Sequence, residues 1–319
     1  MARATPMART TPPRPVAVEG LFPEVAAYRR DAVRLHPRHG VPGPRDSSLG
    51  GPLLWPSSEP WPHCDDDHPR TAFAPPQPGV IPMVPVLQLF AADVPELPFP
   101  HGTDVLHVLW CPFDHEPGYV PRPVLYWRDS SECDSTDASV YGSGHDSVGD
   151  DNAAAPPRPD GAADDYLPNP CVLHPERVTD YPNWDLPDEI ADALEERFDQ
   201  LEEETGWSYW SHLSVSEGIK VGGYPTWTQE PVWPNCPDCG RRMDHLLTIN
   251  SREFNGESWR TWLPLEDTPA TGTVWDLPYE ERTRIQCPPG LTLGDMGGIY
   301  LFDCRRCPER PYAYHSDCS

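Results

Sequence analysis

The chain has 319 residues, enough for one large domain or two ordinary ones with a substantial apolar core. Its 50 Asp and Glu against 24 Lys and Arg give a formal net charge of −26, which disfavours general attraction to nucleic acids or anionic membranes. Its 44 prolines disfavour long uninterrupted helices and central strands, because proline lacks a backbone donor and fixes φ.

The N-terminal part of the chain predicts a leader followed by a helix. Residues 1–18 are rich in Arg, Pro and Thr without periodicity, and we expect them to be a disordered leader. They hold no apolar run of the signal-peptide kind, and no other stretch is apolar enough for a membrane span, so we expect a cytoplasmic protein without a membrane partner. Over residues 22–35, apolar side chains recur at intervals of three and four, which predicts a helix.

Two stretches of the sequence resemble each other. Residues 50–64 read GGPLLWPSSEPWPHC and residues 222–236 read GGYPTWTQEPVWPNC, and without a gap they share both glycines, both tryptophans, the proline after the second Trp and the final Cys. Runs that predict buried strands follow both: PMVPVLQLF and VLHVLWCPF after the first, MDHLLTINS and GGIYLFDC after the second. The order predicts an internal duplication, with a first half at 19–128 and a second at 166–319.

The segment between the halves differs in composition. Residues 129–165 are rich in Asp, Ser, Gly and Ala and predict a disordered acidic insertion. After it, LPDEIADALEERFDQLEEETG predicts the strongest helix, with an apolar stripe, acidic residues on a solvated face and Gly206 at its C-terminal cap.

Two CxxC pairs predict a zinc site. Cys236 and Cys239 lie in CPDC, and Cys304 and Cys307 lie in CRRC, so together they offer four thiolates to a tetrahedral zinc. Four cysteines leave no open position for water, which favours a structural over a catalytic zinc. The alternatives are free or redox-active thiols and disulfides, or a ligand supplied by another cysteine, with Cys287 and Cys318 the nearest candidates.

The first half offers a second candidate metal site. Cys64 and Cys111 occupy the positions that correspond to Cys236 and Cys304, and each is followed four residues later by a histidine, His68 and His115. These residues would form a Cys2His2 set on the same plan. The alternative is a degenerated site of two buried cysteines and two solvated histidines.

Arginines flank both CxxC turns and have two interpretations. They are a candidate anion-binding patch, or they offset the negative charge of a tetrathiolate zinc cluster, which we favour. The residues are Arg241, Arg242, Arg305, Arg306 and Arg310.

Several of these motifs carry a family resemblance. GGPLLWP, PVLQLF, KVGGYPTWTQ, MDHLLTINS and GDMGGIYLFDC together resemble the YwqG-like family, a bacterial domain of unknown function, over most of residues 20–128 and 166–319. The long form rich in Trp and Pro, with CxxC pairs, is similar to actinomycete members. The resemblance implies a duplicated α+β, mostly β fold with a mixed sheet in each half and few helices. It implies no activity, and the metal sites rest on cysteine spacing alone.

No catalytic motif is present: the chain lacks a Walker loop, GxGxxG, GxSxG and HExxH. We therefore expect a non-enzymatic, zinc-stabilised scaffold of the immunity or regulatory type that binds a macromolecule. Its acidity suits a basic protein partner and opposes nucleic acid. The alternative is an enzyme or small-ligand binder with its site in the cleft between the halves.

Overall fold

A computed structural model describes residues 8–66, 68, 79–116, 118–133 and 158–318 of the chain. The chain divides into two compact units. Unit 1 comprises Met1–His36, His174–Cys287 and Asp295–Ser319, and unit 2 comprises Pro37–Leu173 and Pro288–Gly294. The fold is mostly β with few helices, which confirms the predicted fold class. No helix within the described residues is both long and apolar enough to cross a membrane.

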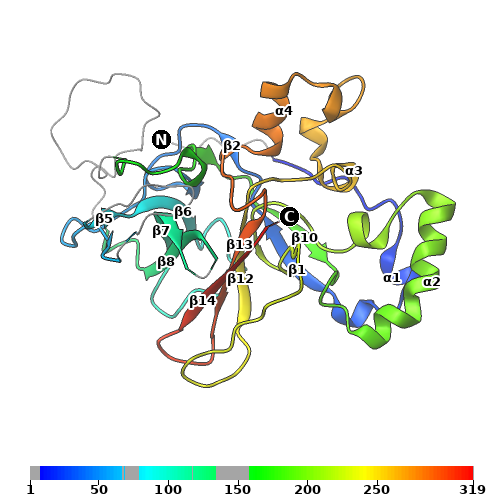
Figure 1. The fold of residues 1–319 in the computed structure, drawn as a ribbon, viewed down its shortest axis with the longest axis horizontal. Coiled ribbons are helices and arrows are strands. Elements are labelled where there is room, and N and C mark those ends of the chain that lie inside the picture. Colours follow the sequence, from blue (N-terminus) through cyan, green and yellow to red (C-terminus); the bar gives the residue numbers. More distant parts are fainter. Residues whose placement is uncertain (1–7, 67, 69–78, 117, 134–157, 319) are drawn as a thin grey trace. The chain divides into compact units, whose positions relative to one another are not determined.

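Unit 1 is built on a six-stranded sheet of order β10-β1-β11-β12-β13-β14 (Figure 1). All its neighbouring strands are antiparallel. The strands are β1 (Arg30–Arg34), β10 (Glu176–Asp180), β11 (Lys220–Gly222), β12 (Asp244–Asn250), β13 (Gly298–Asp303) and β14 (Tyr312–Asp317).

The predicted acidic helix is present in unit 1 as α2 (Asp188–Thr205) and ends at Gly206, whose φ of 72° suits glycine at a helix C-terminus. Its apolar stripe, which includes Phe198, packs against the segment that holds α1 (Val18–Leu21). The remaining helical elements of unit 1 are α3 (Trp259–Trp262), α4 (Tyr279–Gln286), a π turn at Tyr209–Leu213, and 3-10 turns at Ala26–Tyr28, Leu265–Asp267 and Val274–Asp276.

The helix predicted over residues 22–35 is wrong. This segment holds a short 3-10 turn, Ala26–Tyr28, and then strand β1. β1 lies between β10 and β11 and pairs with both, so sheet hydrogen bonds on each side outweigh the helical spacing of the apolar residues.

The predicted leader is bound to unit 1 where the structure describes it. Residues 1–7 lie outside the described residues. Thr11 donates through its backbone to Glu176 at 2.7 Å, and Arg14 is bonded to the carbonyls of Leu213 and Thr179. Residues 8–18 therefore differ from the predicted disorder, because their polar groups find partners in unit 1. Most of the predicted acidic insertion, residues 134–157, lies outside the described residues.

Unit 2 contains a second six-stranded sheet, of order β2-β9-β3-β6-β7-β8, and a separate two-stranded pair, β4-β5. These neighbours are also antiparallel throughout, so the mixed sheet expected for each half is corrected: hairpins and antiparallel returns, without parallel crossovers, connect the described strands. The strands are β2 (Arg38–His39), β3 (Ser48–Leu49), β4 (His63–Cys64), β5 (Ile81–Pro82), β6 (Val84–Phe90), β7 (Val105–His115), β8 (Val120–Arg128) and β9 (Cys171–Val172); a 3-10 turn lies at Asp164–Tyr166.

The two sheets have corresponding strand orders. In each sheet, five of the six strands follow one another in chain order, and the second position is taken by a strand from a different part of the chain. The second strand is β9 in the sheet β2-β9-β3-β6-β7-β8 and β1 in the sheet β10-β1-β11-β12-β13-β14. Residues 30–39 supply β1 to the sheet of unit 1 and β2 to that of unit 2, whereas residues 171–180 supply β9 to unit 2 and β10 to unit 1. The units therefore do not coincide with the predicted halves 19–128 and 166–319. The duplication stays a prediction, which this correspondence supports.

The repeated Gly-Gly motif has a steric role in each unit. A Cβ on Gly223 would lie 2.3 Å from Oδ2 of Asp180, and one on Gly50 would lie 2.4 Å from the carbonyl oxygen of Pro168. Both glycines have positive φ, 65° and 61°. Only glycine fits such positions without strain.

Candidate metal centres

The two CxxC turns of unit 1 meet because of strand register. β12 begins at Asp244 and β13 ends at Asp303, and these two residues are register partners. The turn before β12, which carries Cys236 and Cys239, therefore lies at the same end of the strand pair as the turn after β13, which carries Cys304 and Cys307. One antiparallel strand pair thus brings together two turns whose nearest cysteines, Cys239 and Cys304, are 65 residues apart in the sequence.

Backbone hydrogen bonds close each turn. The N–H of Cys236 donates to the carbonyl of Arg241 at 2.8 Å, and Gly240 donates to the carbonyl of Cys236 at 2.9 Å. In the second turn, Cys304 donates to Pro311 at 2.9 Å and Arg310 donates to Cys307 at 3.0 Å. These bonds fix the backbone from which the thiols project.

The four sulfur atoms have the spacing of a tetrahedral zinc site. The Sγ atoms of Cys236 and Cys307 are 3.7 Å apart, as are those of Cys239 and Cys304, and all four lie within 4.8 Å of one another. A regular tetrahedron with Zn–S bonds of 2.3 Å places sulfurs about 3.8 Å apart. The described cysteines are free rather than disulfide-bonded, and Cys287 and Cys318 lie outside the group. The predicted ligand set could therefore hold a metal ion such as zinc.

The environment shifts two thiols of the group in opposite directions, because burial raises the pKa of Cys307 whereas that of Cys304 is lowered. The backbone N–H groups of Arg306 and Cys307 lower the pKa of Cys304 to about 7, because they stabilise the thiolate. Cys236 and Cys304 belong to an apolar cluster with Trp227, Tyr300 and Phe302.

The flanking arginines lie in two different settings. Arg310 pairs with Asp303, and Arg305 lies 3.4 Å from the same carboxylate. Arg242 stacks on Trp233, with its guanidinium carbon 3.6 Å from the ring centroid, and contacts Asp185 at 3.4 Å. Arg241 and Arg306 are exposed. Three of the five arginines thus have carboxylate neighbours, and the anion-binding role remains a prediction.

The second predicted set comes together in unit 2. The Nε2 atoms of His68 and His115 lie 3.4 Å apart, and Sγ of Cys64 lies 3.8 Å from the first and 3.9 Å from the second. Sγ of Cys111 is 3.2 Å from Nε2 of His68. With Zn–N bonds of about 2.1 Å, a tetrahedral site places two nitrogens about 3.4 Å apart and a nitrogen and a sulfur about 3.6 Å apart. This Cys2His2 group could also hold a metal ion such as zinc.

A β-bulge brings two of these ligands together. Cys111 and His115 both belong to β7, and four residues of regular strand would span about 13 Å. The register between β7 and β8 shifts between these two residues, from the pair Cys111–Arg122 to the pair His115–Val120. The strand bends there, so both side chains reach one point.

Neighbouring charges support this group, and the sequence did not indicate them. Oδ2 of Asp66 lies 3.4 Å from Nδ1 of His115, the ring nitrogen opposite the candidate ligand atom. Arg122 pairs with Asp66 and donates to Sγ of Cys64 at 3.2 Å. Such outer partners orient metal ligands. All four candidate ligands are buried, which differs from the alternative of solvated histidines.

The two groups have equivalent aromatic surroundings. Trp55 and Trp61 lie 5.2 Å apart between ring centroids and pack on the cluster that contains Cys64 and Cys111. The corresponding Trp227 and Trp233 lie 6.0 Å apart in the cluster that contains Cys236 and Cys304. The repeated tryptophans thus belong to the same apolar cluster as two candidate ligands in each unit.

A scan against models of protein families found no match to the chain, and a search of curated proteins found none either. The resemblance to YwqG-like proteins therefore stays a prediction that rests on the motifs.

Proposed function

We propose that the protein is a non-enzymatic binding protein whose two units are each stabilised by one structural zinc ion. The observation that carries this proposal is the pair of four-ligand groups, both spaced for tetrahedral coordination. Cys236, Cys239, Cys304 and Cys307 would hold one ion, and Cys64, His68, Cys111 and His115 the other. Both sets supply four protein ligands, so neither leaves a position for a reacting water, which favours a structural role.

Removal of zinc tests the structural role. Unfolding of the protein should shift to lower temperature when a strong chelator is added, and addition of excess Zn²⁺ should restore it, because the metal binds the folded chain. The chelator mixed with an equimolar amount of Zn²⁺ is the control for chelator binding. An unfolding temperature that is the same with and without the free chelator contradicts the proposal.

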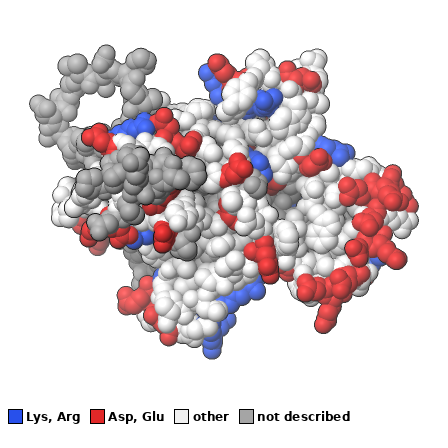
Figure 2. Space-filling view, in the orientation of Figure 1, with Lys and Arg blue, Asp and Glu red and all other residues white. Residues whose placement is uncertain are grey.

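The proposed ligand is a basic segment of a protein partner. Every ionisable residue of α2 except Arg197 is acidic, and Figure 2 shows Asp and Glu side chains crowded over the part of unit 1 where α2 lies. Asp188, Glu195, Glu196 and Glu202 are all exposed. A surface of one sign accelerates and orients association with a partner of the opposite sign.

Charge neutralisation on α2 tests this surface. An oligolysine peptide should bind the Glu195→Gln/Glu202→Gln variant more weakly than wild type, with a shallower dependence on salt, in a calorimetric titration. The matched control is Glu280→Gln/Glu281→Gln, which removes the same charge from α4. Equal weakening by both pairs indicates only the net charge of the chain and rejects α2 as the binding surface.

We further propose that the protein is a cytoplasmic member of the YwqG-like group. The support is the set of quoted motifs together with the mostly β fold and the corresponding strand orders of the two sheets. Under this proposal, an early form with two equivalent sheets later exchanged its first strands. The alternative site between the two halves, for an enzyme or a small-ligand binder, stays a prediction.

A further inference from the structure

Unit 1 contains a pocket of about 560 Å³ that lies outside both candidate metal centres. It is lined by the chain before and at the start of α2, the π turn with the loop after it, residues 225–228, the end of β12 with the residues that follow it, and Met296. A pocket of this size accommodates a small molecule of one or two rings.

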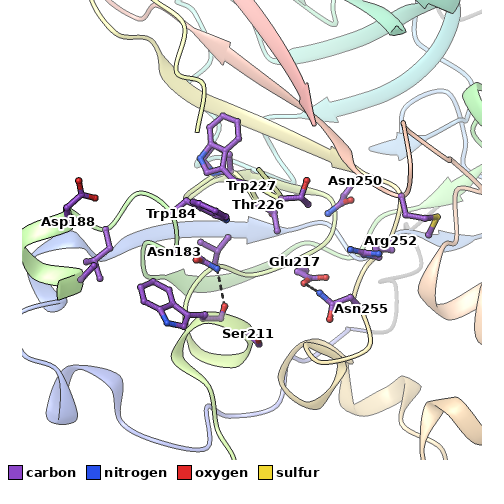
Figure 3. A pocket seen from close by; sticks show the side chains of 17 residues that line it. Asn183, Trp184, Asp188, Ser211, Glu217, Thr226, Trp227, Asn250, Arg252 and Asn255 are labelled. Atoms are coloured by element: carbon purple, nitrogen blue, oxygen red, sulfur yellow. Dashed lines mark hydrogen bonds between the residues drawn. The ribbon is translucent and has the colours of Figure 1, made fainter. Parts of the chain in front are cut away.

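One end of the pocket carries polar groups that lack protein partners (Figure 3). Asn250, the last residue of β12, is only 7% exposed, and its side-chain amide makes no hydrogen bond with any described residue. Arg252 is half-buried, and its guanidinium forms neither a hydrogen bond nor an ion pair within the described part of the chain. The side chains of Asn250 and Arg252 therefore have donor and acceptor groups free to bind a ligand in the pocket.

A carboxylic acid lies beside these two groups. Glu217 accepts a hydrogen bond from the side-chain amide of Asn255 through Oε1, whereas its buried Oε2 has no hydrogen-bond partner among the described residues. Burial raises the pKa of Glu217, and the charge of Arg252 opposes this shift. The unpartnered Oε2 is a hydrogen-bond acceptor, which suits a ligand with hydroxyl groups.

The other end of the pocket is aromatic. In Figure 3, Trp184 and Trp227 lie opposite Asn250 and Arg252. Trp184 is 52% exposed, and the nearby Trp210 is 37% exposed, so large indole faces are open to a ligand. Exposed tryptophans in a pocket provide flat apolar contact with a hydrogen-bonding edge.

The geometry points to a small hydroxylated anion as the ligand: we propose that this pocket binds a sugar ring that carries one carboxylate. Arg252 binds the carboxylate in a charge-assisted pair, and Asn250 and Glu217 bind ring hydroxyls. The apolar face of the ring lies on Trp184. A neutral sugar offers Arg252 no charge-assisted pair, and a polyanion is repelled by the strongly acidic chain. A sugar phosphate shares this chemistry and is distinguished by the test.

Binding of three related sugars to the zinc-replete full chain tests the proposal. Glucuronate, glucose 6-phosphate and glucose are titrated by calorimetry, and saturation-transfer NMR records which ligand protons approach the protein. Glucuronate should bind in a saturable manner with its ring protons saturated, and glucose should bind at least about tenfold more weakly, the usual effect of one charge-assisted pair. Tighter binding of glucose 6-phosphate assigns the anion as a phosphate and overturns the carboxylate.

Two variants identify the site. Arg252→Gln should weaken glucuronate about tenfold or more and leave glucose unchanged, whereas the same change at the exposed Arg284 of α4 should have no effect. Trp184→Ala removes a half-exposed side chain, leaves the fold intact and should abolish saturation of the ring protons. Circular dichroism and zinc content confirm that each variant is folded. The proposal is overturned if none of the sugars binds at millimolar concentration, or if Arg252→Gln and Arg284→Gln bind glucuronate equally.

Discussion

At the scale of single residues, the two candidate centres differ in charge. Zn²⁺ with the four thiolates of Cys236, Cys239, Cys304 and Cys307 would carry two negative charges, whereas two thiolates and two neutral imidazoles in unit 2 would balance the ion. We expect the arginines around the CxxC turns to offset the negative charge of the first centre. In the second, Arg122 and Asp66 instead neutralise each other and orient a ligand on each side.

Removal of one thiol from the tetrathiolate group should release its zinc. We expect Cys236→Ser to lose one zinc ion per chain and to unfold at lower temperature, because a hydroxyl is a poor zinc ligand and Cys236 is buried in the fold. Metal analysis and thermal unfolding measure the two effects. The matched control is Cys318→Ser, at an exposed cysteine outside both groups, and an equal loss of zinc in the control contradicts the assignment.

The outer partners of the second group should tune its affinity without being ligands. Asp66→Asn should lower the zinc affinity of unit 2 by about tenfold to hundredfold, since it weakens the contact with Nδ1 of His115. Competition with a fluorescent zinc chelator measures the affinity. The Asp114→Asn variant, at a neighbouring carboxyl that binds Tyr166, is the control. An affinity that Asp66→Asn leaves at the wild-type value refutes the supporting role.

Buried histidine should make the stability depend on acid. Burial lowers the pKa of His107 from 6.5 to about 3. Between these two pH values the histidine is protonated in the unfolded state and neutral in the native state. The free energy of unfolding therefore falls with pH between 6.5 and 3, by about 1.4 kcal/mol per pH unit for this group. Denaturant unfolding with excess zinc should show a shallower slope for His107→Gln; equal slopes for both proteins would show that His107 does not contribute.

Residue types and spacing predicted the eight candidate ligands but not their supports. CxxC and CxxxH are local patterns, so they are visible in the sequence. Asp66 and Arg122 lie far apart in the chain, and only the pairing of β7 with β8 brings Arg122 to the Cys2His2 group. Pro112 lies in the bulge between Cys111 and His115, but a proline in a strand pattern is equally compatible with an edge strand or the start of a strand, so the sequence alone did not indicate the bulge.

At the scale of elements, the one wrong helix prediction lies where strand pairing determines the structure and the local spacing of apolar residues does not. The acidic helix was predicted correctly because its stripe, acidic first turn and terminal Gly206 all indicate the same structure. Residues 22–35 have a helical stripe as well, yet β1 forms there. Its two partner strands, β10 and β11, come from residues more than a hundred positions later, which no local pattern reveals.

The turn after β11 should tolerate no side chain at its second glycine. We expect Gly223→Ala to lower the free energy of unfolding by more than about 2 kcal/mol, because its Cβ would collide with Asp180, the buried partner of Lys220. Gly102→Ala is the control: its φ of 83° is equally left-handed, but nothing lies within 4 Å of the added Cβ. Urea unfolding compares the two, and similar losses would show that collision adds nothing to backbone strain.

At the scale of the whole molecule, the two units do not coincide with the two halves of the sequence. Each sheet includes one strand, β1 in unit 1 and β9 in unit 2, from the half that supplies most of the other sheet. The sequence predicted two halves from the repeated Gly-Gly and Trp-Pro stretches, and each unit does contain one such stretch, one six-stranded sheet and one candidate metal centre. The exchange of β1 and β9 could not be predicted, because short strands pair equally well with either sheet until tertiary packing selects one. The pocket of unit 1 could not be predicted from the sequence either, since its lining comes from five separate segments.

The number of zinc ions bound per chain tests the central claim most directly. Native mass spectrometry of the purified full chain should show two zinc ions, and the variants Cys236→Ser and His115→Ala should each show one. In Cys236→Ser the cysteines of the Cys2His2 group should stay protected from alkylation, and in His115→Ala those of the four-cysteine group should stay protected. A folded, monodisperse chain that carries no metal would contradict the account.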